Sequence, residues 1–253
     1  MINPDMERHG SRTQRLYLEA ELGPDAVIAA DRGQANYLLN VLRLKAGAQL
    51  FAFNGRDGEW LAELETSGRK TCQLRILRQV RPQSAPGDLW YLFAPLKQAR
   101  LDYMVQKAVE LGVSALVPVI THHTQVGKVN TQRMQANAIE AAEQCSTLCL
   151  PEIREAVKLE AVLADWPTER QLIFCDEAAG EEDAIARLRP LAGKALGVLI
   201  GPEGGFSPDE RARLKALTCV TTIGLGPRIL RADTAAVAAL ALVQAAAGDW
   251  AGT

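Results

Sequence analysis

One loop late in the chain combines three glycines with a single carboxylate. It follows the apolar run 196–200, and its residues are Gly201, Pro202, Glu203, Gly204 and Gly205. Glycine has no side chain, so a bare loop of this kind lets a flat, neutral ligand approach the backbone closely. In a parallel sheet, ligands bind beyond the carboxyl ends of the strands. The loop therefore predicts a small-molecule site, and it lacks the Lys-Ser/Thr pair that a phosphate-binding Walker loop requires.

A simpler interpretation of the same segment is the start of a helix. Ser207 fits an N-cap, Pro208 fits the first helical position, and Glu210 follows the cap by three residues. This pattern predicts a helix beginning at Pro208. It does not explain the glycines that precede the cap on the strand side.

A second loop has the same character. The segment "TIGLGPRILRADTAA", residues 222–236, passes from a strand end through two glycines and a proline. It then brings polar side chains to the start of a helix, namely Arg228, Arg231, Asp233 and Thr234. Two such loops at separate strand ends predict one pocket between them. Three histidines and five cysteines without metal-ligand spacing predict no metal site, and the cysteines are expected to be free thiols.

The elements that must position these loops alternate after residue 88. The apolar runs are 89–96, 115–120, 171–177, 196–201 and 220–226. The helical patterns between and after them are 99–111, 131–146, 180–189, 208–217 and 231–248. Apolar strands alternating with helices predict an α/β fold, with a parallel sheet covered on both faces.

The first third of the chain has a different pattern. Alternating segments around Asn54-Gly55 and Asp57-Gly58 predict a hairpin, and residues 72–80 predict a further strand. The segment 33–47 predicts a short helix ended by Gly47. The Pro- and Gly-containing stretch "RPQSAPGD", residues 81–88, marks a boundary. We therefore expect a small β-rich barrel over 1–84 and an α/β domain over 85–253.

Bulk composition narrows the function classes only slightly. The chain has 253 residues, 48% hydrophobic and 23% charged, as is ordinary for a globular protein. No window reaches the roughly 18 apolar residues of a membrane helix, and the N-terminus has no signal-peptide pattern. We therefore expect a cytoplasmic protein without a membrane partner. The net charge of −2 does not by itself indicate a nucleic-acid partner.

The two loops together resemble a known family. "LIGPEGGFSPDE" followed by "LGPRILRADTAA" is similar to the RsmE-type family of ribosomal RNA uridine-N3 methyltransferases, which belong to the SPOUT class. The resemblance extends to "MVQKAVELGVSALVPV" and "AIEAAEQCSTLCLPEI". "LLNVLRLKAG" and "RLYL" resemble the family's N-terminal PUA-like domain.

This resemblance implies a trefoil-knotted parallel-sheet domain that binds S-adenosyl-L-methionine. It implies a homodimer whose substrate is a decoding-region uridine of 16S rRNA in the small ribosomal subunit. Loop 201–205 would border the adenosine and methionine parts of the cofactor, and the later loop would line its adenine side through backbone contacts. The residues assigned to the cofactor are Gly201, Pro202, Glu203, Gly204, Gly205, Gly224, Leu225, Gly226, Ile229, Leu230, Ala232 and Thr234.

The arginines assigned to RNA contact are Arg12, Arg15, Arg43 and Arg228. The chain also departs from the family at positions where RNA-contacting side chains are usual. Here His122 and His123 replace an arginine, Ser146-Thr147 replaces Gly-Arg, and Asn36 replaces a histidine. These departures leave the cofactor loops untouched, so the cofactor is predicted more firmly than the substrate.

Methyl transfer from a sulfonium is an in-line displacement, so positioning supplies much of the catalysis and no metal is needed. The N3 proton of uracil must leave on or before attack. A cation favours the resulting anion, and Arg231 is the first candidate. Arg231 could instead anchor a phosphate or pair with Asp233. Glu203 could act as a base, or could bond the backbone amides of its own loop.

Two other functions remain open at this stage. One is a ribosome-associated RNA-binding factor without catalysis, which the missing arginine at position 147 favours and the intact cofactor loops oppose. The other is a related knotted methyltransferase that acts on another RNA or on a ribose hydroxyl, which the resemblance of the N-terminal domain opposes.

Overall fold

The computed structural model of the chain describes residues 13–66, 68, 70–179 and 183–251. It divides into two compact units. The first contains residues up to 85 together with 142–149, and the second contains 86–141 and 150–253. The units are described separately.

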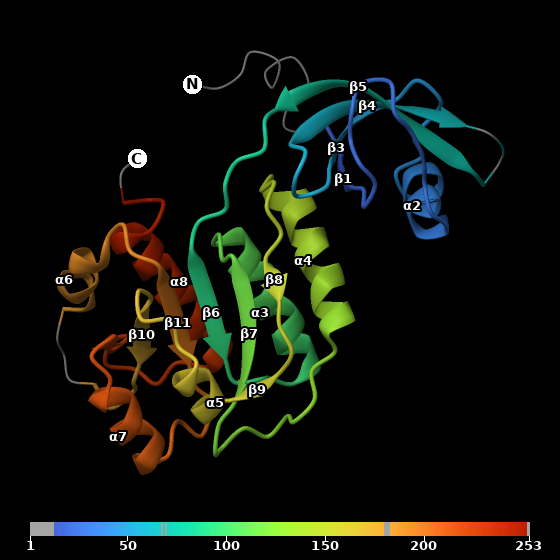
Figure 1. The fold of residues 1–253 in the computed structure, drawn as a ribbon. Helices are drawn as coiled ribbons and strands as arrows, with labels where there is room; N and C mark the ends of the chain where they lie inside the picture. Colours follow the sequence, from blue (N-terminus) through green and yellow to red (C-terminus); the bar gives the residue numbers. More distant parts are fainter. Residues whose placement is uncertain (1–12, 67, 69, 180–182, 252–253) are drawn as a thin grey trace. The chain divides into compact units, whose positions relative to one another are not determined.

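The first unit is built on a five-stranded sheet with the order β1-β3-β4-β5-β2. Its strands are β1 (Arg15–Tyr17), β2 (Val27–Ala29), β3 (Gln49–Phe53), β4 (Glu59–Thr66) and β5 (Cys72–Arg81). β1 pairs with β3 in parallel, and the other pairings are antiparallel. The strand-rich unit is confirmed (Figure 1), although in the described residues no pairing joins the outer strands β1 and β2 into a closed barrel.

The hairpin between β3 and β4 follows directly from its turn residues. Gly55 and Gly58 have φ angles of 84° and 82°, in the region that favours glycine. The Asn54 side chain accepts hydrogen bonds from the amides of Arg56 and Asp57 at 3.1 and 2.8 Å. The predicted hairpin is confirmed.

The helix of this unit ends earlier than the sequence predicts. α2 (Arg32–Asn36) begins with a capping box between Asp31 and Gln34, and η1 (Tyr37–Val41) continues it as a π-helical turn. The chain then leaves the helix through Arg43, whose φ is 56°. Gly47, with φ 83°, lies in the turn before β3 and does not end the helix, so that part of the prediction is wrong.

The second unit contains a seven-stranded sheet in which every pairing is parallel. The order is β12-β10-β11-β6-β7-β8, and β9 also pairs with β7. The strands are β6 (Leu89–Phe93), β7 (Ala115–Ile120), β8 (Glu152–Ile153), β9 (Val157–Lys158), β10 (Gln171–Cys175), β11 (Leu196–Ile200) and β12 (Val220–Ile223). The predicted α/β class is confirmed.

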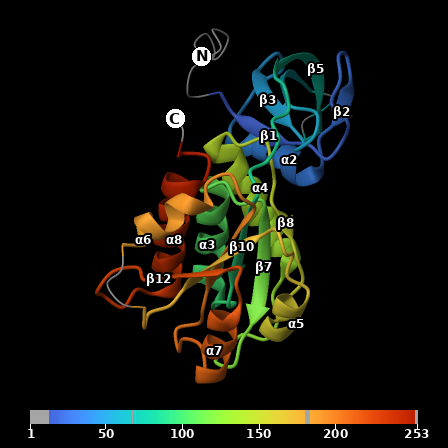
Figure 2. The ribbon, with the colours of Figure 1, turned by 60° about the vertical axis from the view of Figure 1, so that its left-hand side comes forward.

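Helices cover both faces of this sheet (Figure 2). On one face Tyr91 stacks on Phe93, and its hydroxyl donates to the Met104 sulfur at 3.1 Å. On the other face Phe174 packs edge-on against Phe206 in a separate apolar cluster. The helices are α3 (Gln98–Glu110), α4 (Thr131–Cys145), α5 (Leu159–Ala164), α6 (Ala184–Leu188), α7 (Pro208–Ala216) and α8 (Ala232–Ala247), with the 3-10 turn η2 (Arg189–Leu191). No helix in the described ranges is long and apolar enough to cross a membrane.

Candidate functional site: a cavity at three strand ends

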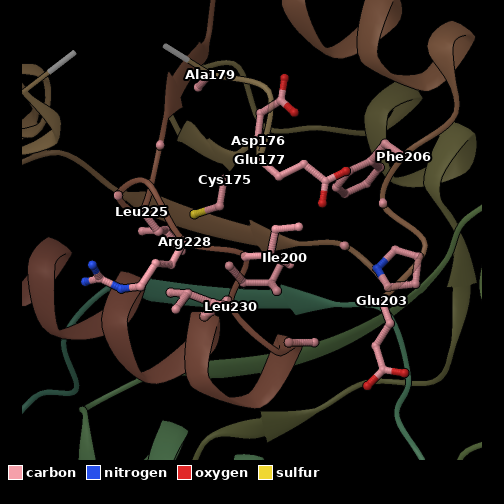
Figure 3. A pocket seen from close by; sticks show the side chains of 18 of the residues that line it. Cys175, Asp176, Glu177, Ala179, Ile200, Glu203, Phe206, Leu225, Arg228 and Leu230 are labelled. Atoms are coloured by element: carbon pink, nitrogen blue, oxygen red, sulfur yellow. The ribbon is translucent and has the colours of Figure 1, made fainter. Parts of the chain in front are cut away.

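A cavity of about 530 Å³ opens where β10, β11 and β12 end. Its wall includes one residue from each of these strand ends. Cys175 is the last residue of β10, Ile200 is the last residue of β11, and Gly224 directly follows β12. Figure 3 shows side chains from all three segments around one space. Carboxyl ends of neighbouring parallel strands share one edge, which explains why distant segments meet here.

The cavity wall contains most of the residues assigned from the sequence to a cofactor. They are Gly201, Pro202, Glu203, Gly205, Gly224, Leu225, Gly226, Ile229, Leu230 and Ala232. Gly204 and Thr234 do not line the cavity. Two loops predicted separately thus form one pocket, while the part played by each residue stays a prediction.

The start of α7 fixes the far end of the glycine loop. Ser207 caps the helix by accepting from the Glu210 amide at 3.2 Å, and Glu210 accepts from the Ser207 amide at 2.8 Å. The predicted cap is confirmed. The buried Glu210 carboxylate also accepts from the His122 amide at 2.8 Å, which ties the loop after β7 to this helix start.

Neighbouring side chains and the backbone conformation favour glycine at positions of this loop. A Cβ on Gly201 would lie 2.4 Å from the Phe206 ring, and one on Gly204 would lie 3.3 Å from the His123 Cβ. Gly205 has φ +68°, and a Cβ there would lie 2.5 Å from the Glu177 Oε1. These contacts favour glycine in the loop even without a ligand, and close approach of a ligand to the loop stays a prediction.

Glu203 does not bond the amides of its own loop. Its carboxylate forms an ion pair with Arg100, in the first turn of α3, and both side chains are partly exposed to solvent. The alternative of a self-capping carboxylate is therefore wrong. Figure 3 shows the Glu203 side chain directed away from the cavity centre.

The second loop presents an exposed edge to the cavity. Arg228 lines the wall, and Ile229 is 93% exposed, which is unusual for an isoleucine. Arg231, the candidate catalytic cation, is the N-cap residue of α8, and its side chain makes no capping hydrogen bond. It is exposed and does not line the cavity. Its catalytic role stays a prediction.

The end of β10 supplies a third wall that the sequence analysis missed. Asp176 has a fully buried side chain whose charge is balanced by Lys215 at 2.9 Å and Arg211 at 3.4 Å. Glu177 pairs with Arg211 at 2.8 Å. Burial raises the pKa of the Cys175 thiol to about 12, so the thiol stays protonated and is not a nucleophile at neutral pH. The "QLIFCDE" strand end carried the signal, since its carboxyl end must join the same sheet edge.

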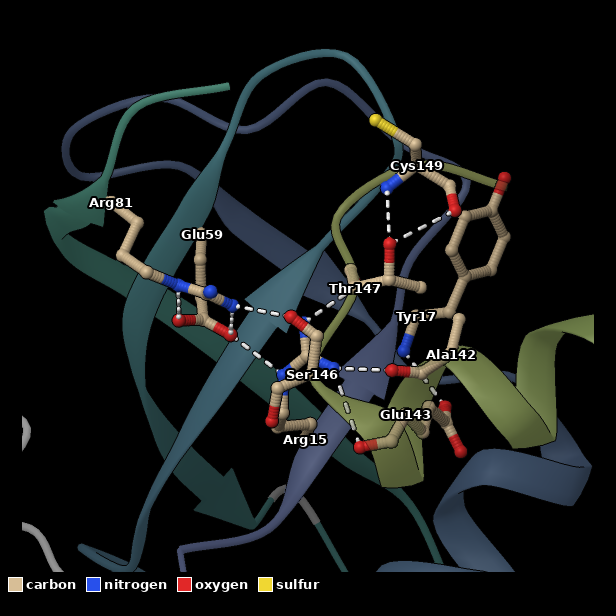
Figure 4. Close-up of polar contacts among 9 residues, drawn as sticks. All are labelled: Arg15, Tyr17, Glu59, Arg81, Ala142, Glu143, Ser146, Thr147 and Cys149. Atoms are coloured by element: carbon tan, nitrogen blue, oxygen red, sulfur yellow. Dashed lines mark hydrogen bonds and ion pairs between the residues drawn. The ribbon is translucent and has the colours of Figure 1, made fainter. Parts of the chain in front are cut away.

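Arg15 has a structural place within the first unit. Its guanidinium pairs with Glu59 at 2.6 Å and donates to the carbonyl oxygens of Ala142 and Thr147 (Figure 4). The residue is only 8% exposed. Arg81 pairs with the same Glu59 carboxylate at 2.7 Å. This burial does not favour the RNA-binding assignment of Arg15, which stays a prediction.

The other assigned RNA contacts are less constrained. Arg12 lies outside the described residues. Arg43 is exposed, and Arg228 is exposed at the cavity. All five cysteines are free. Across the part of the chain that the structure describes, no cluster of three or more His, Cys, Asp or Glu residues could hold a metal ion.

Comparison with known proteins identifies the class. Residues 83–244 match the RNA methyltransferase domain family, and residues 30–77 match the RNA methyltransferase PUA domain. A ribosomal RNA small subunit methyltransferase E from Rickettsia conorii is 33% identical over 91% of this chain and 94% of its own length. One from Bacillus subtilis is 25% identical over 83% of this chain and 86% of its own.

Two solved structures are similar over almost their full length. A methyltransferase from Legionella pneumophila, in complex with the bound cofactor SAM, has a TM-score of 0.82 and 31% identity, with 93% of this chain and 98% of that one covered. The ribosomal RNA small subunit methyltransferase E of Neisseria gonorrhoeae, bound to S-adenosyl methionine, has a TM-score of 0.82 and 28% identity, with 94% and 100% covered. The chain belongs to the ribosomal RNA small subunit methyltransferase E family of RNA methyltransferases.

Proposed function

We propose that the protein transfers a methyl group from S-adenosyl-L-methionine to N3 of one uridine in the 16S rRNA of the small ribosomal subunit. The observation that carries the proposal is the cavity formed by both glycine-containing loops at adjoining strand ends. Family membership supports the reaction class, and the cofactor in the two similar structures supports the ligand.

The cavity suits this ligand in size and chemistry. Its volume falls within the roughly 300–1,000 Å³ of small-molecule sites. Ile200, Leu225 and Leu230 give it apolar surface for a flat base. The Glu177 carboxylate also lies at the wall, where it is paired with Arg211. The exposed Ile229 would lose contact with water when the site is filled.

The bound cofactor would supply an activated methyl group on a sulfonium. The residues of the chain would then hold the acceptor base in line with the methyl–sulfur bond and assist removal of its N3 proton. The backbone of 225–232 would bind the adenine side, and loop 201–205 would border the rest. Arg231 would favour the uracil anion if it turned toward the acceptor, and as an exposed cation it could equally anchor a phosphate.

Two finer features of the fold belong to the same proposal. We infer a trefoil knot over the last strands and loops. It is supported by the path of the chain, which leaves the edge strand β12 and returns to pack α8 against α3 and β11. We also propose that the PUA-like unit binds RNA, with the division of domains near residue 84.

The assembly and location follow from the same family. We propose a homodimer in the cytoplasm, where the small ribosomal subunit is found. The α8 side chains Val237, Ala238, Ala241 and Leu242 are only half-buried in the single chain. A helix with apolar residues on nearly every side is expected to be buried all round, and a second subunit would complete that burial.

A deletion strain tests the substrate assignment. Mass spectrometry of nucleosides from its 16S rRNA should show loss of 3-methyluridine, which should return when the intact gene is restored. Unchanged 3-methyluridine in the deletion strain would refute the assignment. Loss of a methyl group from another RNA, or from a ribose, would support the alternative methyltransferase.

A further inference from the structure

The turn that follows β7 holds two adjacent histidines against the glycine loop. His123 Nδ1 lies 3.2 Å from the carbonyl oxygen of Gly205, and its Cβ would contact a Cβ on Gly204 at 3.3 Å. His122 and His123 are the histidines of the described residues, and their rings meet edge to face with centroids 4.8 Å apart. Gly205 lines the cavity and His123 does not, so His123 is joined to the cavity wall through this contact.

The turn is fixed at both ends. The Thr121 amide donates to the Thr124 hydroxyl at 2.8 Å, and the Thr124 amide donates to the Thr121 carbonyl at 3.2 Å. The His122 amide donates to the buried Glu210 carboxylate at 2.8 Å. His123 is nevertheless exposed. The fold therefore presents this imidazole on a rigid turn, with its far edge open to an incoming group.

The contact with Gly205 determines which ring nitrogen carries the proton in the neutral imidazole. A carbonyl oxygen can only accept a hydrogen bond, so His123 Nδ1 must be the donor. Nε2 then bears a free lone pair. A hydrogen bond that fixes the tautomer in this way is how imidazoles are prepared to accept protons.

The proposed reaction needs a proton acceptor beside the target base. The N3–H proton must be removed, and the nearby carboxylate of Glu203 already forms an ion pair with Arg100. Glu177 is paired with Arg211 on the other side of Gly205. Glu210 accepts from two backbone amides. These three carboxylates are thus paired or hydrogen-bonded, and the ring that contacts His123 is that of His122.

We propose that His123 Nε2 accepts the N3 proton of the target uracil, an inference that rests on the proposed function. The N3–methyl bond forms as the sulfur–methyl bond breaks, and the electron pair of the broken bond remains on the sulfur, which becomes neutral. The N3 proton passes to Nε2, and the exposed imidazolium then releases it to water. His123 is a catalytic residue in this scheme because it contacts the acceptor base.

His123→Asn is the variant that separates proton transfer from loop support. The amide nitrogen of asparagine can take the place of Nδ1 and keep the hydrogen bond to Gly205, but it offers nothing at the Nε2 position. His122→Asn is the matched control on the same turn. The measurement is single-turnover methylation of unmodified 30S particles from about pH 5.5 to 9.5, with saturating cofactor, read as 3-methyluridine.

The parent rate should fall on the acid side, where imidazoles take up protons, and should level off above neutrality. His123→Asn should be about 100-fold slower at pH 7, a typical general-base contribution. Its rate should rise with pH toward that of the parent, because the uracil then ionises in solution. Cofactor affinity should be unchanged, His122→Asn should behave like the parent, and added imidazole should partly rescue His123→Gly.

Three outcomes would overturn the inference. A His123→Asn variant that keeps the parent's rate at pH 7 and its acid limb removes His123 from catalysis. A rate loss that is equal at every pH, with weakened cofactor binding, shows that His123 only supports the loop. A parent that forms no 3-methyluridine overturns the proposed function together with this inference, whereas an active parent with unaffected variants overturns the inference alone.

Discussion

At the scale of single residues, the burial of Arg15 indicates a structural role for this side chain. The residue is 8% exposed, and its guanidinium is ion-paired to Glu59 and lies 4.3 Å from the Phe53 ring centroid. Arg15 is therefore part of the protein interior. Burial lowers the pKa of Arg15, while its bond to Glu59 acts in the opposite direction. Glu59 is itself 2% exposed, so removal of its partner leaves part of a buried charge uncompensated.

Arg15→Leu is therefore expected to lower the free energy of unfolding by about 3 kcal/mol, the lower range for breaking a buried pair, because Arg81 still contacts Glu59. Urea denaturation measures this change. Arg43→Leu, at an exposed arginine, should cost less than about 0.5 kcal/mol. Unchanged stability of Arg15→Leu, combined with lost binding to 30S particles, would support Arg15 as an RNA contact.

The difference between what the sequence predicted and what it missed also begins with residues. The cap formed by Ser207 and Glu210 was predicted because all its partners lie within four positions. The burial of Arg15 was not, because its partners are Glu59 and carbonyls of 142–147, which only the tertiary fold brings near. The same holds for Glu203, whose partner Arg100 lies 103 positions away.

At the scale of elements, the predicted helices α3, α4, α7 and α8 match within one residue at each end, whereas the apolar runs of β6, β10 and β12 extend two or three residues past the strands. The five apolar runs and the start of α7 follow from pattern and capping. The early end of the helix at Val41 did not follow, since a π-helical turn and a positive φ at Arg43 depend on packing. Cys175, Asp176 and Glu177 were not assigned to the site because they contain no glycine, although the end of β10 contributes to the cavity together with the ends of β11 and β12.

Gly205 tests the glycine loop as a unit. Alanine at φ +68° is strained, and its Cβ would displace the Glu177 carboxylate from the cavity wall. We expect Gly205→Ala to weaken S-adenosylmethionine binding about tenfold, or 1.4 kcal/mol, by calorimetry. Gly193→Ala has similar strain at φ +77°, meets no atom within 4 Å and lies outside the cavity wall, so affinity should not change. Equal losses in both variants would indicate general destabilisation.

The contact between α3 and α4 gives a prediction about pH. Asp102 on α3 accepts from Arg133 at 2.7 Å and from Asn137 at 2.8 Å, both on α4. The hydrogen bond from Arg133 is the largest influence, and it lowers the pKa of Asp102 to about 2. A depressed pKa stabilises the folded state above the unfolded value near 4, and that contribution is lost as the pH falls toward 2.

Asp102→Asn should therefore lower the free energy of unfolding by about 1 kcal/mol at pH 7, the range for a partly exposed ion pair. Thermal unfolding of both proteins between pH 7 and 2 should show that the difference in stability between the parent and the variant disappears below pH 4. A difference that stayed constant over this range would show that Asp102 acts by packing and not by its charge.

At the scale of the whole molecule, the half-buried face of α8 predicts self-association. Sedimentation at micromolar concentration should give about twice 27.4 kDa. Leu242→Glu should yield a monomer, because an unpaired carboxylate would have to be desolvated at the interface. A parent protein that sediments as a monomer and still methylates would show that the site is complete within one chain.

The central claim is that this chain methylates N3 of a uridine in 16S rRNA. The most direct measurement supplies the purified protein with labelled S-adenosylmethionine and unmodified 30S particles, in the presence of EDTA, and identifies the labelled nucleoside. The account predicts about one labelled methyl group per particle, found only as 3-methyluridine, with no need for a metal. Label on a ribose, on another base or on tRNA alone, or no transfer at all, would contradict it.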